Sequence, residues 1–550
     1  MKKSKFLFGL IIPILSGCSC SLFNFGPFSW SKYKNDKVAM SLSSEKFENY
    51  NLQEFPSLDD KLNNLKKVVT DKGSVEDFIR KYNEVSANVV KAVDCYIIAN
   101  TKYYATNENK YQQLSGKYYS IYLNAHTFLM NLENDIYHSS KAIKESYFVG
   151  MSDEQIEERI NGNVESKIKA NYDEEFKKLQ DDGQELYTDY RNGVLKLDDY
   201  LDQGFDLMLK YVNKANELVS QIPENNYLDF SYDYYYSRDY KYEDTAVPFI
   251  NYVKQYFVPI LKTKNKLNKP RNVDSDLLKV ISSYNLCNIR ANMCDLFESY
   301  ADEMGGRYLT AFNNAFKYGY YCFSDNSNSM GTAYEWTLNS VNDAVLFFSR
   351  NYQDVLSVAH EFGHYYSCTQ NNGIRKNDAY DLQETYSQAN EFTFCTYLLE
   401  QKKDDSNAAT YNYFVDEKIY NSISQIINEA VITEIEQFAF TTPNLTKAAL
   451  IDGINDILDS YEGTASDTYF MAPILTSPCY YFSYATSLME ALQFAVLPFE
   501  DAKETYTKLV ENTGSSTMVG RWEDAGLTSP FKEKSFQTLA AVCKDIANKY

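Results

Sequence analysis

At 550 residues the chain exceeds what one hydrophobic core usually holds, so we expect two or three lobes. Apolar residues make up 44% of the sequence and aromatic residues 15%, a composition that excludes a disordered chain. The net charge of −21 argues against direct binding of the folded surface to nucleic acid or anionic lipid, because these repel an acidic protein at long range. Cationic or neutral substrates fit this charge better.

The N-terminus reads MKKSKFLFGLIIPILSGCSC. A basic start and a short apolar stretch, too short to span a bilayer, predict an export signal over residues 1–17. The signal ends in Leu-Ser-Gly-Cys18, which resembles the lipobox of bacterial lipoproteins, where the cysteine is lipidated and becomes the first residue. We expect lipidation of Cys18, a tether over residues 18–45, and a membrane partner reached through this N-terminal lipid anchor. The alternative is an ordinary signal peptide with incidental cysteines.

The part of the chain from residue 46 to residue 225 has the composition of long helices. Proline costs about 3 kcal/mol inside a helix, and no proline lies between Pro56 and Pro223. Ser74 and Ser152 are each followed by acidic or amide side chains at the spacing of a helix start. We predict an N-terminal helical lobe over residues 46–225.

A Tyr-rich and Asp-rich stretch between Pro223 and Pro248 changes the composition of the chain. We place the main domain boundary there, with a catalytic domain over residues 226–550. The alternative is a Tyr-rich loop inside one continuous helical body. Further on, AFKYGYYCFSD and DAVLFFSRNY are short β-prone runs bounded by Gly, Asn, Asp and Ser, and they predict a small sheet.

The stretch DVLSVAHEFGHYYSCTQ follows that predicted sheet. If residues 353–366 are helical, His360 and His364 project from one side of the helix. Two imidazoles so placed can reach one zinc ion at about 2.0 to 2.1 Å each. Glu361 then lies beside the metal, where a general base acts on zinc-bound water. The alternative is a helix whose two histidines bind nothing.

A catalytic zinc ion takes three protein ligands and keeps one position open. No histidine follows His364 in the sequence, so a third ligand from downstream must be Asp, Glu or Cys. We choose Glu384, on a second predicted helix that can fold back antiparallel to the first. The alternative is that Glu384 belongs to a capping box with Asp381. Cys368 is interpreted as a core residue, because a thiolate would damp the Lewis acidity of the metal.

The HEFGH motif and the following ETYSQANE, which begins at Glu384, resemble the thimet oligopeptidase and oligoendopeptidase F family. The segment SPCYYFSYATSLMEAL resembles the tyrosine-rich segment of that family. The resemblance implies a mainly α fold, with two helical lobes around a deep substrate channel and a small β-sheet before the zinc-binding helix. It implies zinc ligation by His360, His364 and Glu384, with Glu361 as the base.

Two positions depart from the family pattern. The family usually has a further histidine three residues after the second zinc histidine, where this chain has Ser367. It also has a histidine in the C-terminal segment, where the best register places Ile474. Because Ile474 cannot donate to a developing oxyanion, we assign that role to Tyr481 and Tyr484. Tyr480 is then a substrate contact, and the alternative for all three tyrosines is simple packing.

These features predict a zinc-dependent endopeptidase that cleaves short peptides outside the cell, at the extracellular face of a bacterial membrane. The first alternative is a catalytically weak or inactive peptide-binding surface lipoprotein of the same fold, which the missing downstream histidine favours and the intact Glu361 opposes. The second is a structural surface protein in which the motif is accidental.

Overall fold

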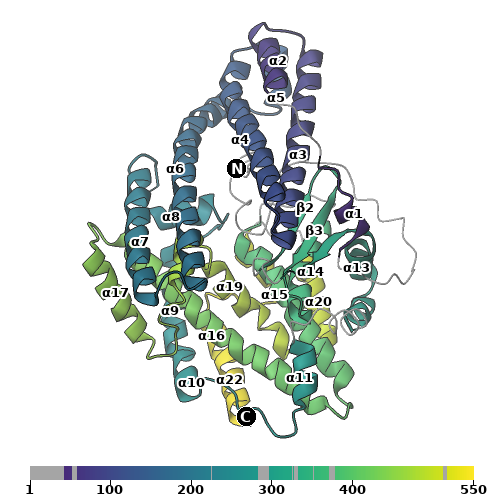
Figure 1. The fold of residues 1–550 in the computed structure, drawn as a ribbon, viewed down its shortest axis with the longest axis vertical. Helices are drawn as coiled ribbons and strands as arrows, with labels where there is room; N and C mark the ends of the chain where they lie inside the picture. The colour runs from purple at the N-terminus through teal and green to yellow at the C-terminus, as the bar shows by residue number, and fades with distance from the viewer. Residues whose placement is uncertain are drawn as a thin grey trace. The chain divides into compact units, whose positions relative to one another are not determined.

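The computed structural model describes residues 43–550 except 53–57, 225, 283–295, 325, 327–331, 351, 371–377 and 512–516. The predicted signal peptide, Cys18 and nearly all of the predicted tether lie outside the described residues. Within the described ranges, no helix is both long enough and apolar enough to cross a membrane. The chain is mostly helical and contains a three-stranded sheet, so the predicted mainly α fold with a small β-sheet is confirmed, whereas the deep substrate channel stays a prediction (Figure 1).

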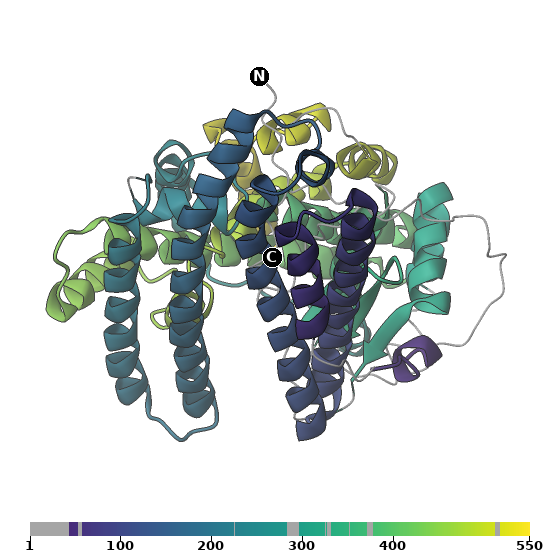
Figure 2. The ribbon, with the colours of Figure 1, turned by 90° about the horizontal axis from the view of Figure 1, so that it is seen from above.

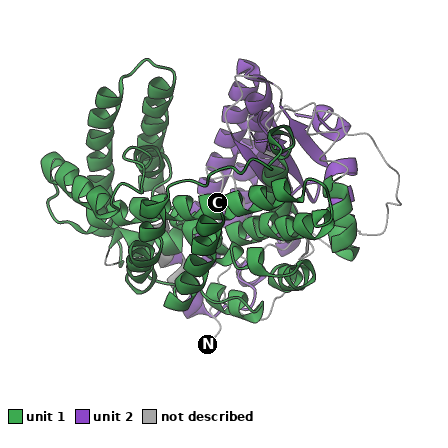
Figure 3. Ribbon diagram, turned by 90° about the horizontal axis from the view of Figure 1, so that it is seen from below, with its two compact units in different colours: residues 1–22, 171–309, 354–550 green, residues 23–170, 310–353 purple. Residues whose placement is uncertain are grey.

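The chain forms two compact units, each assembled from separate stretches of sequence (Figure 3). Unit 1 contains residues 171–309 and 354–550, and unit 2 contains residues 23–170 and 310–353. Both sides of the predicted boundary at residues 225 and 226 lie in unit 1. The division into two domains at that point, and its alternative of a Tyr-rich loop inside one continuous helical body, stay predictions.

Unit 2 is built on the long helices expected from the absence of proline. Ser74 caps helix α3, where its hydroxyl accepts from the backbone N–H of Asp77, and the helix ends at Asn107 with a left-handed backbone. Ser152 and Gln155 form a reciprocal capping box at the start of α6. The helices that lie wholly or partly in this unit are α1 (Glu45–Glu48), α2 (Asp59–Thr70), α3 (Val75–Thr106), α4 (Asn109–Tyr137), α5 (Lys141–Tyr147), α6 (Asp153–Arg191) and α13 (Gly306–Tyr318).

The predicted small sheet precedes the histidine helix in the chain and belongs to unit 2. Strand β3 (Asp343–Phe348) is central, with β1 (Tyr320–Phe323) parallel to it and β2 (Ala333–Leu338) antiparallel. Its residues from Val345 to Phe348 are fully buried, as the continuous apolar run of the sequence indicates. Strand β2 was not predicted from the sequence.

Unit 1 is helical throughout its described residues, apart from turns and loops. Its elements, in addition to the second half of α6, are α7 (Leu197–Val219), α8 (Tyr227–Tyr234), α9 (Tyr242–Tyr256), α10 (Val258–Thr263), α11 (Ser275–Ser282), α14 (Val355–Gln370), α15 (Tyr380–Lys402), α16 (Ala408–Thr441), α17 (Lys447–Ser460), α18 (Met471–Thr476), α19 (Phe482–Ala491), η1 (Phe494–Val496), α20 (Phe499–Glu511), α21 (Met518–Asp524) and α22 (Glu533–Lys549).

Helix α7 packs antiparallel against the second half of α6, and Figure 2 shows the two joined by a turn at one end. Phe176 stacks on Tyr211 with ring centroids 4.7 Å apart, and Lys214 bridges to Glu175 at 2.6 Å. Apolar contact in the interior and ion pairs at the surface are the usual way in which two amphipathic helices pair.

Helix α15 is the centre of unit 1. Every residue from Tyr380 to Leu398 is buried, although many of them are polar. The helix packs against α14 on one side and against α19 and α20 on others. A buried polar group is costly unless it has a hydrogen-bond partner, so the polar side chains of α15 must be paired or bind a ligand.

Candidate metal centre

Helix α14 carries both motif histidines. Its start is fixed by Asp354, whose carboxylate accepts from the backbone N–H groups of Leu356 and Ser357, both at 3.1 Å. From this start the helical repeat brings His360 and His364 to one side, with ring centroids 5.0 Å apart. His364 is 3% exposed and Glu361, between them, is 6% exposed.

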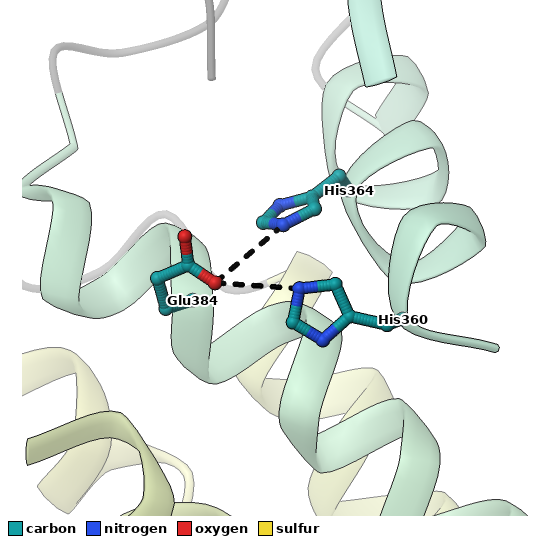
Figure 4. A group of neighbouring side chains, drawn as sticks. All are labelled: His360, His364 and Glu384. Carbon is teal, nitrogen blue, oxygen red and sulfur yellow. Dashed lines mark ion pairs between the residues drawn. The ribbon is translucent and has the colours of Figure 1, made fainter. Parts of the chain in front are cut away.

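Glu384 reaches the two histidines from the first turns of α15. Its Oε2 lies 3.4 Å from His360 Nε2 and 3.7 Å from His364 Nε2, and Figure 4 shows the three side chains converging. One donor atom from each residue lies within 4.8 Å of the other two. The structure thus brings together all three predicted ligands.

A second carboxylate orients His360. The Nδ1 of His360 donates to Glu391 Oε1 at 2.8 Å, which turns Nε2 of the ring toward Glu384. Lys418 on α16 binds the other oxygen of Glu391 at 2.7 Å. Burial alone would raise the pKa of Glu391, but Lys418 and His360 outweigh it and lower that pKa to about 2. Glu391 is therefore a permanent anion that fixes the ring of His360.

The local potential favours a cation. Burial by itself would lower the pKa of His360, but the carboxylates of Glu384 and Glu391 raise it well above its ordinary value. The negative potential that stabilises a proton on the imidazole also stabilises a divalent ion between the same groups.

The two helices approach closely enough for this geometry because of Gly363. A methyl group at that position would lie 2.6 Å from the Cα of Ser387 and 2.9 Å from the carbonyl oxygen of Tyr386. Asn390 also pins the helices together, since its Nδ2 donates to the carbonyl of Ala359 at 2.6 Å. Close contact between helix backbones thus sets the separation of the histidines from Glu384.

The tyrosine-rich segment reaches the third ligand. The hydroxyl of Tyr480 donates to Glu384 Oε1 at 2.7 Å, and it lies 3.2 Å from the hydroxyl of Tyr484. Tyr481 packs edge-on against Tyr480, with ring centroids 5.7 Å apart. Tyr480, which the sequence analysis assigned to substrate contact, therefore touches the predicted metal ligand Glu384. Tyr484 is connected to Glu384 through the hydroxyl of Tyr480.

The two departures from the family pattern are also visible. Ile474 lies on α18 and is 3% exposed, so a buried apolar side chain stands where the family pattern has a histidine. Ser367 donates its hydroxyl to the backbone carbonyl of His364 at 2.9 Å. The side chain at position 367 is thus engaged in a local contact within α14.

The donor set fits zinc. Two imidazoles and one carboxylate are a common ligand set of catalytic zinc sites, where three protein ligands leave a position for water or substrate. His360 has the orienting carboxylate that zinc-bound histidines usually have, and the carboxylate of Glu384 is held by Tyr480.

Comparison with known proteins gives a match in structure alone. No protein-family model and no curated protein sequence matches the chain. A structure assigned provisionally as oligoendopeptidase F superposes with a TM-score of 0.62 at 13% identity, covering 92% of this chain and 99% of that chain. The chain has the oligoendopeptidase F fold.

Two further structures agree with this assignment of the fold. PZ peptidase A with an inhibitor has a TM-score of 0.62 at 14% identity, and covers 92% of this chain and 99% of that chain. A protein of Bacillus anthracis, also assigned provisionally as oligoendopeptidase F, has a TM-score of 0.59 at 15% identity and covers 93% and 99%. The resemblance in fold that the motif indicated is confirmed.

Within this oligoendopeptidase F fold, the capping-box alternative for Glu384 is wrong. Helix α15 begins at Tyr380 after Ala379, which makes no side-chain cap, and Asp381 binds Arg238 instead.

Three partners of the site were missed from the sequence. Glu391 follows Glu384 by two helical turns, a spacing that could have revealed it, whereas Lys418 and Arg238 are distant in the chain and have no local signal.

Proposed function

We propose that this protein is a zinc-dependent endopeptidase that cleaves short peptides. The observation that carries the proposal is the convergence of His360, His364 and Glu384, with Glu361 on the same helix as the two histidines. A zinc ion held by these three residues would polarise a scissile carbonyl and lower the pKa of water at the site.

The residues around this site have separable roles in the proposed reaction. Glu361 accepts the proton of the attacking water and passes it to the leaving amine, as a general base and then a general acid. Glu391 holds His360 in one tautomer and one orientation. Tyr481 and Tyr484 are the proposed donors to the developing oxyanion, and Tyr480 holds Glu384 in addition to its proposed contact with substrate.

The proposed substrates and location follow from charge and from the N-terminus. A chain of net charge −21 attracts cationic peptides, does not repel neutral ones, and repels nucleic acid. The signal-like N-terminus and Cys18 support action at the extracellular face of a bacterial membrane, with the protein held there by lipid.

A second candidate is a peptide-binding lipoprotein of the same fold with little or no turnover. The buried Ile474, at the position of a family histidine, favours this candidate. The two candidates share zinc binding and differ in hydrolysis.

Measuring zinc content together with hydrolysis of a quenched-fluorescent peptide library tests the proposal. We expect one zinc ion per chain, lost in His364→Ala, and retained without turnover in Glu361→Gln, because an amide cannot accept the proton. His138→Ala and Glu400→Gln, at exposed positions, are the matched controls and should behave as the wild type. Zinc and peptide binding without hydrolysis would favour the second candidate, and a wild type without zinc would refute both.

A further inference from the structure

Arg238 connects the metal-ligand helix to the tyrosine-rich segment. It is 2% exposed and lies in the loop between α8 and α9. Its Nε binds Asp381 at 2.8 Å, on the turn of α15 that precedes Glu384. Its Nη1 donates to the carbonyl of Cys479 at 3.0 Å, and its Nη2 donates to the hydroxyl of Ser483 at 2.8 Å. One rigid guanidinium thus sets the spacing of two elements of the site.

The backbone that Arg238 holds is in an unusual conformation. Cys479 has a φ of 64°, in the left-handed region that residues other than glycine rarely adopt. Its N–H donates to Glu436 on α16 at 2.7 Å, and the hydroxyl of Tyr236 donates to the carbonyl of Pro478 at 2.5 Å. A strained backbone conformation persists only where surrounding contacts hold it in place. Here the side chains of Tyr236, Arg238 and Glu436 hold it through hydrogen bonds.

The next residue after this clamped backbone is Tyr480, whose hydroxyl meets Glu384. We propose that Tyr236 and Arg238 are positioning residues, which fix the backbone of Pro478 and Cys479 so that Tyr480 holds the carboxylate of Glu384 in its ligand geometry. The inference rests on the proposed function in that Glu384 is taken as a metal ligand. Neither Tyr236 nor Arg238 touches the histidines or Glu384 in the hydrogen bonds and ion pairs of the described residues. Tyr236 therefore acts through the backbone that precedes Tyr480, and Arg238 joins that backbone to Asp381 on α15.

A pair of conservative variants separates positioning from stability. Tyr236→Phe removes the hydrogen bond to Pro478 and leaves the ring in place. Tyr240→Phe, the matched control, removes a hydroxyl of the same loop that donates to Asp381 at 2.6 Å and does not reach the 478–483 backbone. Both variants keep the buried pair of Arg238 and Asp381, whose disruption would leave an uncompensated charge.

We expect Tyr236→Phe to lower kcat and zinc affinity by about 10-fold or more, the usual effect of losing an outer partner of a metal ligand. Tyr240→Phe should leave both near the wild-type values at a similar thermal stability. In a Tyr480→Phe background, the Tyr236→Phe change should have no further effect on zinc affinity, because the two act in series. Arg238→Lys keeps the positive charge but loses the planar set of guanidinium donors. It should therefore lower kcat and zinc affinity as Tyr236→Phe does. If it does not fold, Ser483→Ala tests the same contact.

Amide hydrogen exchange of residues 479–484 provides a readout that requires neither zinc nor turnover. Exchange in this segment should be faster in Tyr236→Phe than in Tyr240→Phe, in the metal-free protein. Equal exchange and equal zinc affinity in the two variants, with an active wild type, would overturn the positioning role and leave the proposed function standing. A wild type without zinc or hydrolysis would overturn the proposed function, and the exchange comparison would still decide whether Tyr236 holds the segment.

Discussion

Replacing Gly363 by alanine tests whether close packing of α14 on α15 sets the metal geometry. The added methyl group would lie 2.6 Å from Ser387 Cα, whereas carbon atoms pack best at roughly 3.5 to 4 Å. Because the two nearest atoms, Ser387 Cα and the carbonyl oxygen of Tyr386, belong to the backbone, no side-chain rotation can relieve the contact. The helices must separate by about 1 Å, which exceeds by several-fold the tolerance of about 0.2 Å expected for metal–ligand distances.

The energetic terms oppose each other. Overpacking a well-packed site costs about 1 to 3 kcal/mol, and alanine recovers up to about 1 kcal/mol relative to glycine in a helix interior. We therefore expect Gly363→Ala to be destabilised by up to about 2 kcal/mol, and to lose zinc affinity on the order of 10- to 100-fold, comparable with the loss of an outer-shell partner.

The assay combines thermal unfolding with zinc competition against a chelator of known affinity. Gly116→Ala, in α4, is the matched control, because a methyl group there would meet nothing within 4 Å. That variant should gain about 1 kcal/mol and bind zinc as the wild type does. If Gly363→Ala is stabilised like the control and keeps its zinc affinity, helix contact does not set the site.

Four further predictions concern other parts of the chain. Cys18→Ala should release the protein from membranes or block its processing, and unchanged partition on fractionation would contradict lipidation. Tyr481→Phe and Tyr484→Phe should each lower kcat by about 10²- to 10³-fold with folding intact, and retention of kcat/KM would make them packing residues. Ile474→His should leave hydrolysis unchanged or raise it, so a folded variant with reduced kcat would contradict the register. Burial raises the pKa of Glu436 from 4.5 to about 8, so its contribution to stability is full below pH 4.5 and is lost as pH rises through about 8. Glu436→Gln should gain stability relative to the wild type over that range, and a constant difference between their unfolding free energies would refute the shift.

The parts of the fold that could be predicted depend on local patterns. The start of α3 at Ser74 and of α6 at Ser152 follows from hydrogen bonds between neighbours in sequence, which spacing alone reveals. The facing of His360 and His364 follows from the helical repeat in the same way. Strand β2 was missed because it is only six residues long and its apolar residues alternate with Glu335 and Thr337. Such a short alternating pattern is a weak signal in a single sequence.

The parts that could not be predicted depend on contacts between distant residues. Arg238 meets Asp381 across 143 positions and Cys479 across 241 positions, and no periodicity near Arg238 marks it as buried. Lys418 is a similar case, because a lysine on a helix is usually a surface residue. The role of Tyr480 was assigned to substrate, since only the packed structure brings its hydroxyl to Glu384.

The order of the site residues along the chain has a consequence for how the protein would acquire the proposed zinc ion. The three donors lie on two successive helices, whereas Tyr480 joins Glu384 from 96 positions further on. Closing a short chain segment costs less entropy than closing a long one, and synthesis also delivers the near partner first. We therefore expect helices α14 and α15 to bind zinc while the rest of the chain is still partly unfolded. The tyrosine-rich segment would then pack onto these two helices after the metal has bound. In such a protein the metal acts as a folding nucleus, and zinc supplied during refolding should shorten the path to the native state.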